Sequence, residues 1–442
     1  MRFGEGNEVG EMSLPEDLSR EELDLLQRER LQSLVNDTVS GNAFWRRRLE
    51  ESGWGSTADA AKRFEDLAAL GEFPVCSKQD FVADQDEHRP YGTNLSEPLA
   101  GYTRLHQTSG TTGRPLRWLD TPEAWGNLLD AWSQMFRIAG VRAEDRFAFP
   151  FSFGPFIGFW AAFEGAAASG HLCLPGGGMN SAARLRLIED NQATVLCCTP
   201  TYALRLAEVA REEGVDLASG SVRMLIVAGE PGGSVPAVRK EIESAWDARV
   251  IDHWGMTELG PIAVECDEGP GGMHVLESEC IAEIVDPDTL KPVPPGVQGE
   301  LLVTTLRRTG SPVLRYRTGD LVIADPETCP CGRELLRLRG GILGRADDMI
   351  TVRGNNVFPS SIEAVIRSVS GVAEFRVVVE TETALDRFSV EIEPVAGAAV
   401  DEVIAGVEAG IRSTFNFQAE VSAVEPGQLP RFELKGRRFV RK

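Results

Sequence analysis

The segment from Gln107 to Pro115 concentrates four hydroxyl side chains and two glycines in nine residues. Glycine lets the backbone turn with positive φ and approach a ligand closely, and consecutive N–H groups in such a turn form an anion-binding nest. The segment therefore predicts a loop that binds triphosphate oxygens, although a polar surface turn is the alternative explanation. It is not a Walker A loop, because the closing Lys-Ser/Thr pair is missing. The candidate phosphate-binding residues are Thr108, Ser109, Gly110, Thr111, Thr112 and Gly113.

Two acidic residues further along the chain are candidates for binding a metal ion and a sugar. Glu258 closes the segment from His253, which follows a predicted strand ending at Ile251. Ligands of parallel α/β sheets bind outside the carboxyl ends of strands, so Glu258 is placed to hold Mg²⁺ on phosphate oxygens. Asp320 follows a glycine turn and could accept both hydroxyl groups of a ribose. The alternatives are a solvated glutamate and an ordinary Gly-Asp turn.

Two regions near the C-terminus, which contain basic or both basic and acidic residues, are further candidates for a functional role. Residues 344–348 and 353–359 lie where the pattern of predicted elements changes, which is where a hinge is expected. Lys435 belongs to the basic tail of residues 434–438. The alternative role for such a tail is solubility.

A set of cysteine and histidine residues points to a metal ion. Cys266 precedes His274 by eight residues, and Cys329 and Cys331 follow in a Cys-Pro-Cys-Gly sequence. Cys-x-Cys followed by glycine can present two thiolates to one ion, and Cys₃His is a common structural zinc set. Reduced, buried cysteines are the alternative. The remaining cysteines are expected in the core: Cys76, Cys173, Cys197, Cys198 and Cys280.

The elements that must position these residues indicate an α/β protein. Short β-like runs alternate with amphipathic helices between residues 146 and 251, which predicts a parallel, doubly wound sheet. Helices are also expected over residues 21–50, with a break near 40–42, and over 122–138. Residues 272–323 read as a β-rich part, and the pattern after residue 345 as a smaller α+β unit. We therefore expect a large N-terminal domain, 1–345, and a small, mobile C-terminal domain, 346–442.

Composition limits the partners and the compartment. The 442 residues include 45 Lys+Arg against 67 Asp+Glu, a formal charge of −22, which argues against nucleic acid and anionic membranes. The N-terminus lacks the pattern of a signal peptide. The apolar run 156–174 is interrupted by Glu164 and His171, which favours a buried helix over a membrane span. A cytoplasmic protein is expected, since eight cysteines are too few for a disulfide scaffold in this length.

In this order and spacing, the segments resemble the adenylate-forming superfamily of acyl-CoA synthetases. They are Thr-Ser-Gly-Thr-Thr-Gly-Arg-Pro, Trp-Gly-Met-Thr-Glu, Tyr-Arg-Thr-Gly-Asp-Leu, Gly-Arg-x-Asp-Asp and the near-terminal lysine. Residues 353–363 and Leu105-His106 look like the phenylacetate–CoA ligase branch. The resemblance implies that a carboxylic acid attacks Mg·ATP to give an acyl-adenylate, and that CoA then displaces AMP. Two alternatives stay open: loading of a carrier-protein phosphopantetheine, and a catalytically inactive nucleotide- and zinc-binding homologue.

The resemblance also implies roles for individual residues. Ser109 to Gly113 would bind the β- and γ-phosphates, Thr257 the α-phosphate, Glu258 the magnesium ion, and Asp320 and Arg345 the ribose. Ala228, Gly229 and Glu230 would line the adenine and acyl pocket, and His253, Trp254, Gly255 and Met256 would complete the nucleotide site. Asp347 matches the hinge, Gly354 the pantetheine tunnel, and Lys435 the lysine that bridges carboxylate and α-phosphate.

The acid and the remaining partners follow from the same resemblance. The acyl pocket would contain Phe151, Phe156, Ala228, Gly255 and Pro261, which favours an aromatic acid; core packing is the alternative for the phenylalanines. Trp254 stands where the branch usually has tyrosine. Some members of the branch carry zinc on Cys, His, Cys and Cys in the order found here. The branch also suggests a homodimer.

Overall fold

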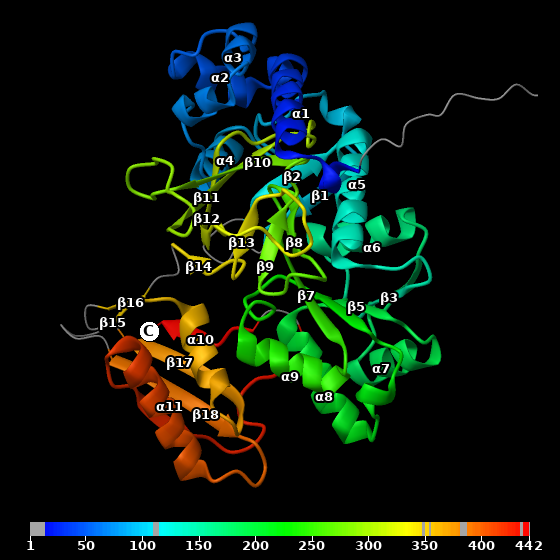
Figure 1. The fold of residues 1–442 in the computed structure, drawn as a ribbon, viewed down its shortest axis with the longest axis vertical. Helices are drawn as coiled ribbons and strands as arrows, with labels where there is room; N and C mark the ends of the chain where they lie inside the picture. Colours follow the sequence, from blue (N-terminus) through cyan, green and yellow to red (C-terminus); the bar gives the residue numbers. More distant parts are fainter. Residues whose placement is uncertain are drawn as a thin grey trace, which may run out of the picture.

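The computed structural model describes residues 14–108, 115–346, 350–352, 355–380, 387–433 and 436–441. Figure 1 shows a large body, coloured blue to yellow, and a smaller one, coloured orange to red, packed beside α9. We call residues 14–346 the N-terminal body and residues 350–441 the C-terminal unit. Several predicted site residues lie outside the described residues: Ser109 to Gly113, Asp347, Gly354 and Lys435.

The central sheet of the N-terminal body has eight strands in the order β13-β9-β8-β7-β6-β5-β3-β4. Neighbouring strands are parallel from β4 to β7 and antiparallel from β7 to β13. The predicted parallel sheet therefore continues into an antiparallel part, because the short turn at residues 257–259 cannot make a parallel crossover. The strands are β3 (Arg146–Phe149), β4 (Leu172–Pro175), β5 (Val195–Cys198), β6 (Met224–Val227), β7 (Arg249–Met256), β8 (Gly260–Glu265), β9 (Gly272–Val275) and β13 (Arg337–Arg339).

Helices cover both faces of this sheet, as a doubly wound fold requires. Along β3, Phe147 and Phe149 pack in the core with α5 and α6, whereas Ala148 packs in the core with α7, α8 and α9. This alternation is the period of two that a strand buried on both faces imposes. The helices are α5 (Pro122–Ala139), α6 (Ile157–Ala168), α7 (Ser181–Asp190), α8 (Pro200–Glu213) and α9 (Pro236–Trp246).

Local sequence signals explain where several of these helices begin and end. The Thr199 side chain accepts a hydrogen bond from the N–H of Tyr202 at the start of α8, Pro200 occupies its first turn, and Gly214 ends it with φ 71°. These are the N-cap, N1 and C′ preferences of helices. The predicted break near residues 40–42 is present between α1 (Arg20–Ser33) and α2 (Ala43–Glu51). Two further helices follow, α3 (Thr57–Arg63) and α4 (Lys78–Glu87).

A second, antiparallel sheet forms most of the predicted β-rich part. Its order is β10-β11-β12-β14, and a separate hairpin of β1 and β2 lies on the chain before α5. Strand β9, which falls in the same sequence region, joins the central sheet instead. The strands are β1 (Arg104–Gln107), β2 (Arg117–Asp120), β10 (Cys280–Val285), β11 (Gln298–Thr305), β12 (Tyr316–Ile323) and β14 (Gly344–Arg345).

The C-terminal unit has a hydrophobic core of its own, built around Ile362, Phe375, Val390 and Val407. Its sheet has the order β19-β18-β17-β20, in which β20 runs parallel to β17 and so places the end of the chain beside it. The elements are β15 (Ile350–Val352), β16 (Asn355–Val357), α10 (Pro359–Ser368), β17 (Val372–Glu380), β18 (Arg387–Pro394), α11 (Val400–Phe415), β19 (Glu420–Ala423) and β20 (Phe439–Arg441). Within the described residues, no helix combines the length and apolar character needed to cross a bilayer.

Candidate active site and metal centre

The turn between β7 and β8 carries Thr257 and Glu258. The Glu258 side chain is buried, and the hydroxyl of Tyr316 donates a hydrogen bond to its Oε1 at 3.3 Å. The Thr257 carbonyl accepts from Nη1 of Arg308 at 2.6 Å, and Arg308 forms two 2.7 Å hydrogen bonds with the buried Asp120. A buried ion pair therefore fixes the backbone beside a carboxylate, which is the kind of oxygen ligand that Mg²⁺ prefers.

Three of the predicted nucleotide-binding residues meet one another. The indole N–H of Trp254 donates to Oδ2 of Asp320 at 3.1 Å, and Nη1 of Arg345 lies 3.5 Å from Oδ1 of the same carboxylate. Asp320 and Arg345 are also direct neighbours across β12 and β14. Trp254 thus orients the carboxylate predicted to bind the ribose, a contact that sequence reasoning did not foresee.

The segment Ala228-Gly229-Glu230 follows β6 at its carboxyl end. Gly229 has φ 93°, a backbone conformation that residues other than glycine rarely adopt. The Glu230 carboxylate accepts from the N–H of Thr201 at 2.8 Å and from the N–H of Gly436 at 2.6 Å. One oxygen therefore binds the start of α8, and the other binds the C-terminal unit.

The remaining residues of the β7–β8 hairpin have structural contacts. His253 packs edge-to-face on Trp132 with ring centroids 4.9 Å apart, and burial lowers the pKa of its imidazole to about 4. It is therefore neutral at pH 7. Gly255 lies opposite Pro261, and a Cβ on Gly255 would come within 2.4 Å of the Gly260 carbonyl oxygen, so only glycine fits there. Met256 pairs with Gly260 in the same register.

The candidate phosphate loop is the connection between β1 and β2. Thr108 closes it: its N–H donates to the Leu116 carbonyl, and its hydroxyl accepts from the Leu116 N–H, both at 3.0 Å. Just before it, His106 stacks on Trp125 with centroids 5.1 Å apart, so this imidazole also has a packing role.

The phenylalanines predicted to line the acyl pocket pack largely on one another. The Phe151 ring stacks on Phe159 with centroids 4.2 Å apart, and Phe156 meets Phe159 edge-to-face at 6.1 Å. Phe153 contacts Trp160 at 4.8 Å. The segment therefore forms an apolar, aromatic wall on the chain between β3 and α6.

The cysteine and histidine residues predicted to bind a metal come together in space. The ligand atoms of Cys266, His274, Cys329 and Cys331 all lie within 4.8 Å of one another. Cys266 Sγ is 3.6 Å from Cys329 Sγ, and Cys331 Sγ is 3.4 Å from His274 Nε2. Tetrahedral zinc, with Zn–S near 2.3 Å and Zn–N near 2.0 Å, separates its ligand atoms by about 3.5 to 3.8 Å. The four residues therefore fit a closed zinc site.

The surroundings of the four residues favour the same ion. A Cβ on Gly269 would lie 2.4 Å from Cys329 Sγ, so glycine leaves the space that the sulfur occupies. Burial lowers the pKa of His274 to about 4, which keeps the imidazole neutral as a ligand must be. Burial also raises the pKa of Cys266 to about 12, so its thiolate needs a compensating cation.

Comparisons with known proteins identify the family. The sequence model described as "AMP-binding enzyme" matches residues 104–306, and "AMP-binding enzyme C-terminal domain" matches residues 354–442. Phenylacetate-coenzyme A ligase of Thermus thermophilus is 33% identical, over 95% of this chain and 96% of that protein. The ligase of the same name from Escherichia coli is 31% identical, over 95% of each. The chain belongs to the adenylate-forming enzymes, in the phenylacetate–CoA ligase branch. It is an AMP-forming acid–CoA ligase, which activates a carboxylic acid with ATP and transfers the acyl group to CoA.

A related ligase has been solved in two reaction states, and this chain is more similar to one of them than to the other. 2-Hydroxyisobutyryl-CoA ligase in the postadenylation state, with 2-HIB-AMP, is 30% identical and superposes with a TM-score of 0.90 over 97% of this chain and 91% of that chain. The same enzyme with 2-HIB-AMP and CoA in the thioesterification state, 31% identical over the same shares, gives 0.73.

Sequence reasoning on the ligase missed the residues that hold its site in place. Asp120 and Arg308 carry no motif signal that distinguishes them from ordinary core or surface residues, and the motif that begins at Tyr316 did not indicate a role for the tyrosine itself. Arg308 is 2% exposed and Asp120 is fully buried, and their mutual pairing offsets the cost of burying the two charges. Asp120 and Arg308 lie 188 positions apart in the sequence, so their pairing becomes visible only in the folded chain.

Proposed function

We propose that this ligase forms its acyl-adenylate at the carboxyl ends of β6 and β7. In this site Thr257 contacts the α-phosphate and Asp320 and Arg345 bind the ribose. Glu258 would hold Mg²⁺, which neutralises phosphate charge when bound. The observation that carries the proposal is the position of β12: Tyr316 contacts Glu258, and Asp320 contacts Trp254 on β7. One strand thus connects the predicted metal end of ATP to the predicted ribose end.

We assign the charge-stabilising role to Lys435 and propose that Ser109 to Gly113 bind the β- and γ-phosphates. Adenylation depends mainly on positioning and on stabilising the charge that develops on the bridging oxygens. A lysine on the C-terminal unit supplies that charge only while the unit packs against the N-terminal body.

Residues 346–442 are, in this proposal, a domain that turns about Asp347 between the two half-reactions, with Gly354 lining the path of the pantetheine. The higher similarity to the postadenylation structure than to the thioesterification structure supports the view that the arrangement described here serves the first half-reaction.

The proposed substrate is an apolar, aromatic carboxylic acid. The stacked rings of Phe151 and Phe159 and the neighbouring Phe156 offer favourable contacts to an aromatic acyl group. Gly255 and Pro261, opposite each other on the β7–β8 hairpin, and Ala228 after β6 would complete the pocket. The four-residue Cys/His set is proposed to hold a structural zinc ion, because four protein ligands leave no position for water.

The test measures the two half-reactions separately with the Lys435→Ala variant. Acid-dependent exchange of pyrophosphate with ATP reports adenylation, and release of AMP from supplied acyl-adenylate and CoA reports thioester formation. We expect adenylation to fall about 10²-fold or more, as for other lost charge-stabilising donors, and thioester formation to persist. Equal loss of both steps contradicts the role of Lys435. Arg437→Ala, which removes an exposed charge from the same tail, is the control.

The same exchange assay over a panel of acids addresses the substrate. Phenylacetate, benzoates and 2-hydroxyisobutyrate are compared at equal concentrations, and aromatic acids are expected to give the higher exchange rates. A preference for the small hydroxy acid would contradict the aromatic proposal. Replacing CoA by a carrier protein bearing phosphopantetheine tests the alternative acceptor.

A further inference from the structure

The described residues on either side of Leu434-Lys435 are both bound by the N-terminal body. Oε2 of Glu433 lies 3.3 Å from Nη1 of Arg184 on α7. The N–H of Gly436 donates to Oε2 of Glu230, after β6, at 2.6 Å. The two contacts enclose a short stretch of chain, and each joins the C-terminal unit to the N-terminal body.

Arg184 is held rigidly by its own surroundings. It is 3% exposed, its Nε donates to the Gly176 carbonyl at 3.0 Å, and its Nη1 donates to the Tyr202 hydroxyl at 2.6 Å. Its guanidinium also lies 5.2 Å from the centre of the Tyr202 ring. A buried arginine with these partners presents a fixed positive charge to Glu433.

Glu230 is fixed in a similar way. Its Oε1 accepts the N–H of Thr201 in the first turn of α8, where a carboxylate is also favoured by the helix dipole. Its Oε2 is then aimed at the N–H of Gly436. A charge-assisted hydrogen bond of 2.6 Å is short and directional, so it fixes the backbone next to Lys435 in sequence.

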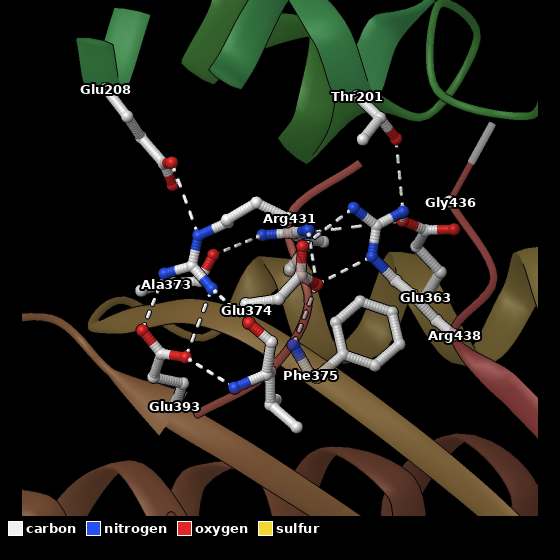
Figure 2. Close-up of polar contacts among 12 residues, drawn as sticks. Thr201, Glu208, Glu363, Ala373, Glu374, Phe375, Glu393, Arg431, Gly436 and Arg438 are labelled. Carbon is white, nitrogen blue, oxygen red and sulfur yellow. Dashed lines mark hydrogen bonds and ion pairs between the residues drawn. The ribbon is translucent and has the colours of Figure 1, made fainter. Parts of the chain in front are cut away.

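Arg438 secures the far side of the same segment, as Figure 2 shows. Its Nη1 donates to the Thr201 hydroxyl at 3.1 Å, so it too contacts the start of α8. Its Nε and Nη2 donate to the two oxygens of Glu374 on β17 at 2.6 and 3.0 Å. The end of the chain is therefore attached both to the sheet of the C-terminal unit and to the N-terminal body.

We infer that Arg184 and Glu230 are positioning residues for the first half-reaction, which clamp residues 433 and 436 so that Lys435 meets ATP and the acid in register. The inference rests on the proposed role of Lys435. Because both contacts cross between the body and the unit, any rotation of the unit breaks them. The clamp therefore acts during adenylation and is absent during thioester formation.

Glu230→Gln and Glu433→Gln test the clamp through its two contacts. Replacing the Glu230 carboxylate removes a charge-assisted hydrogen bond, so we expect adenylation to slow about 10- to 100-fold. Losing the ion pair of the exposed Glu433 is expected to cost about 2- to 5-fold. In Glu433→Gln the KM values for ATP and acid stay unchanged, and thioester formation from supplied acyl-adenylate stays at the wild-type rate. Equal losses in both half-reactions would mean a merely structural role and would overturn the clamp.

A double-mutant cycle tests the contact between Arg184 and Glu433 even if the variant that lacks the buried arginine is less stable. Arg184→Met and Glu433→Gln remove the same contact, so the double variant should adenylate no more slowly than Arg184→Met alone. Additive losses would overturn the pairing. Arg186→Met, on an exposed arginine of the same helix that lies 3.9 Å from Glu213, is the matched control and should keep wild-type rates.

Comparing Lys435→Ala with the wild-type enzyme distinguishes a failure of the proposed lysine role from a failure of the clamp alone. If Lys435→Ala keeps full adenylation, the proposed function of the lysine fails, and the clamp fails with it. If Lys435→Ala loses adenylation while Glu230→Gln and Glu433→Gln match the wild type, only the clamp is wrong.

Discussion

Tyr316 and Asp320 lie on one strand that connects the two ends of the proposed nucleotide site. Both residues lie on β12, on either side of an irregularity in its pairing with β11, where Gly319 has φ 75°. Tyr316 contacts Glu258, and Asp320 contacts Trp254. Trp254 lies within β7, whereas Glu258 lies just after its end. The spacing of the Tyr-Arg-Thr-Gly-Asp motif thus has a geometric reason besides the chemistry of the aspartate.

The buried imidazole of His253 leads to a prediction about how the stability of the protein depends on pH. Burial lowers its pKa to about 4, against about 6.5 in an unfolded chain. Between those values the unfolded state binds more protons, so the contribution of the neutral imidazole is complete above pH 6.5 and is lost as the pH falls towards 4. His253→Gln should therefore lose less stability than the wild type between pH 7.5 and pH 5, measured by denaturant unfolding.

The control for that measurement is His88→Gln, which replaces a histidine with a 41% exposed side chain. It should follow the wild-type dependence on pH. Identical slopes for His253→Gln and the wild type would show that His253 is not desolvated in the folded protein.

At the scale of elements, the cysteine and histidine residues join parts that are distant in sequence. Cys266 follows β8, His274 lies on β9, and Cys329 and Cys331 precede β13, which pairs with β9. Arg337, on β13, also donates to the Gly269 carbonyl at 3.0 Å. A metal ion here would fasten the antiparallel edge of the central sheet to the loop before β13.

We predict near-stoichiometric zinc in the purified protein and a lower melting temperature after chelation. The loss follows from leaving buried thiols without their cation. Cys331→Ser should abolish binding, as measured by elemental analysis and thermal unfolding. Cys173→Ser, outside the cluster, is the control and should keep its zinc. A metal-free protein with wild-type stability would contradict this prediction.

At the scale of the whole molecule, the contact between the body and the unit is rich in charged groups. Arg431 bridges Glu393 on β18, with bonds of 3.1 and 2.5 Å, to Glu208 on α8 at 3.3 Å (Figure 2). A cavity of about 120 Å³ lies in the same contact, with Arg367 and Glu241 among its lining residues. Polar, incompletely packed contacts are typical of domains that move relative to each other.

This contact should weaken as salt is added. Screening shortens the reach of charge interactions from about 10 Å at 0.1 M to about 3 Å at 1 M salt. We expect the radius of gyration of the substrate-free protein, measured by X-ray scattering, to rise over that range while its circular dichroism is unchanged. Glu208→Gln should shift the rise to lower salt. A constant radius would show that apolar packing, rather than charge, holds the two parts together.

Much of the local structure could be predicted from the sequence, because local forces determine it. The α8 helix begins and ends where Thr199, Pro200 and Gly214 predict, since capping acts within one turn. The alternation of strand-like runs with helices likewise predicted the doubly wound sheet, and the Cys-Pro-Cys-Gly sequence predicted the candidate metal site. The direction of β8 and β9 was not foreseen, because the pattern of apolar residues does not reveal whether a strand pairs parallel or antiparallel.

The sequence by itself determined the elements, the family and the set of chemical groups. The tertiary structure alone decided which groups meet: Gly436 binds Glu230 across 206 positions of the chain, and Arg184 pairs with Glu433 across 249. No local signal encodes such contacts, because they depend on how the C-terminal unit packs against α7 and α8. Hydrogen bonds and ion pairs act over a few ångströms in space, whatever the separation in sequence.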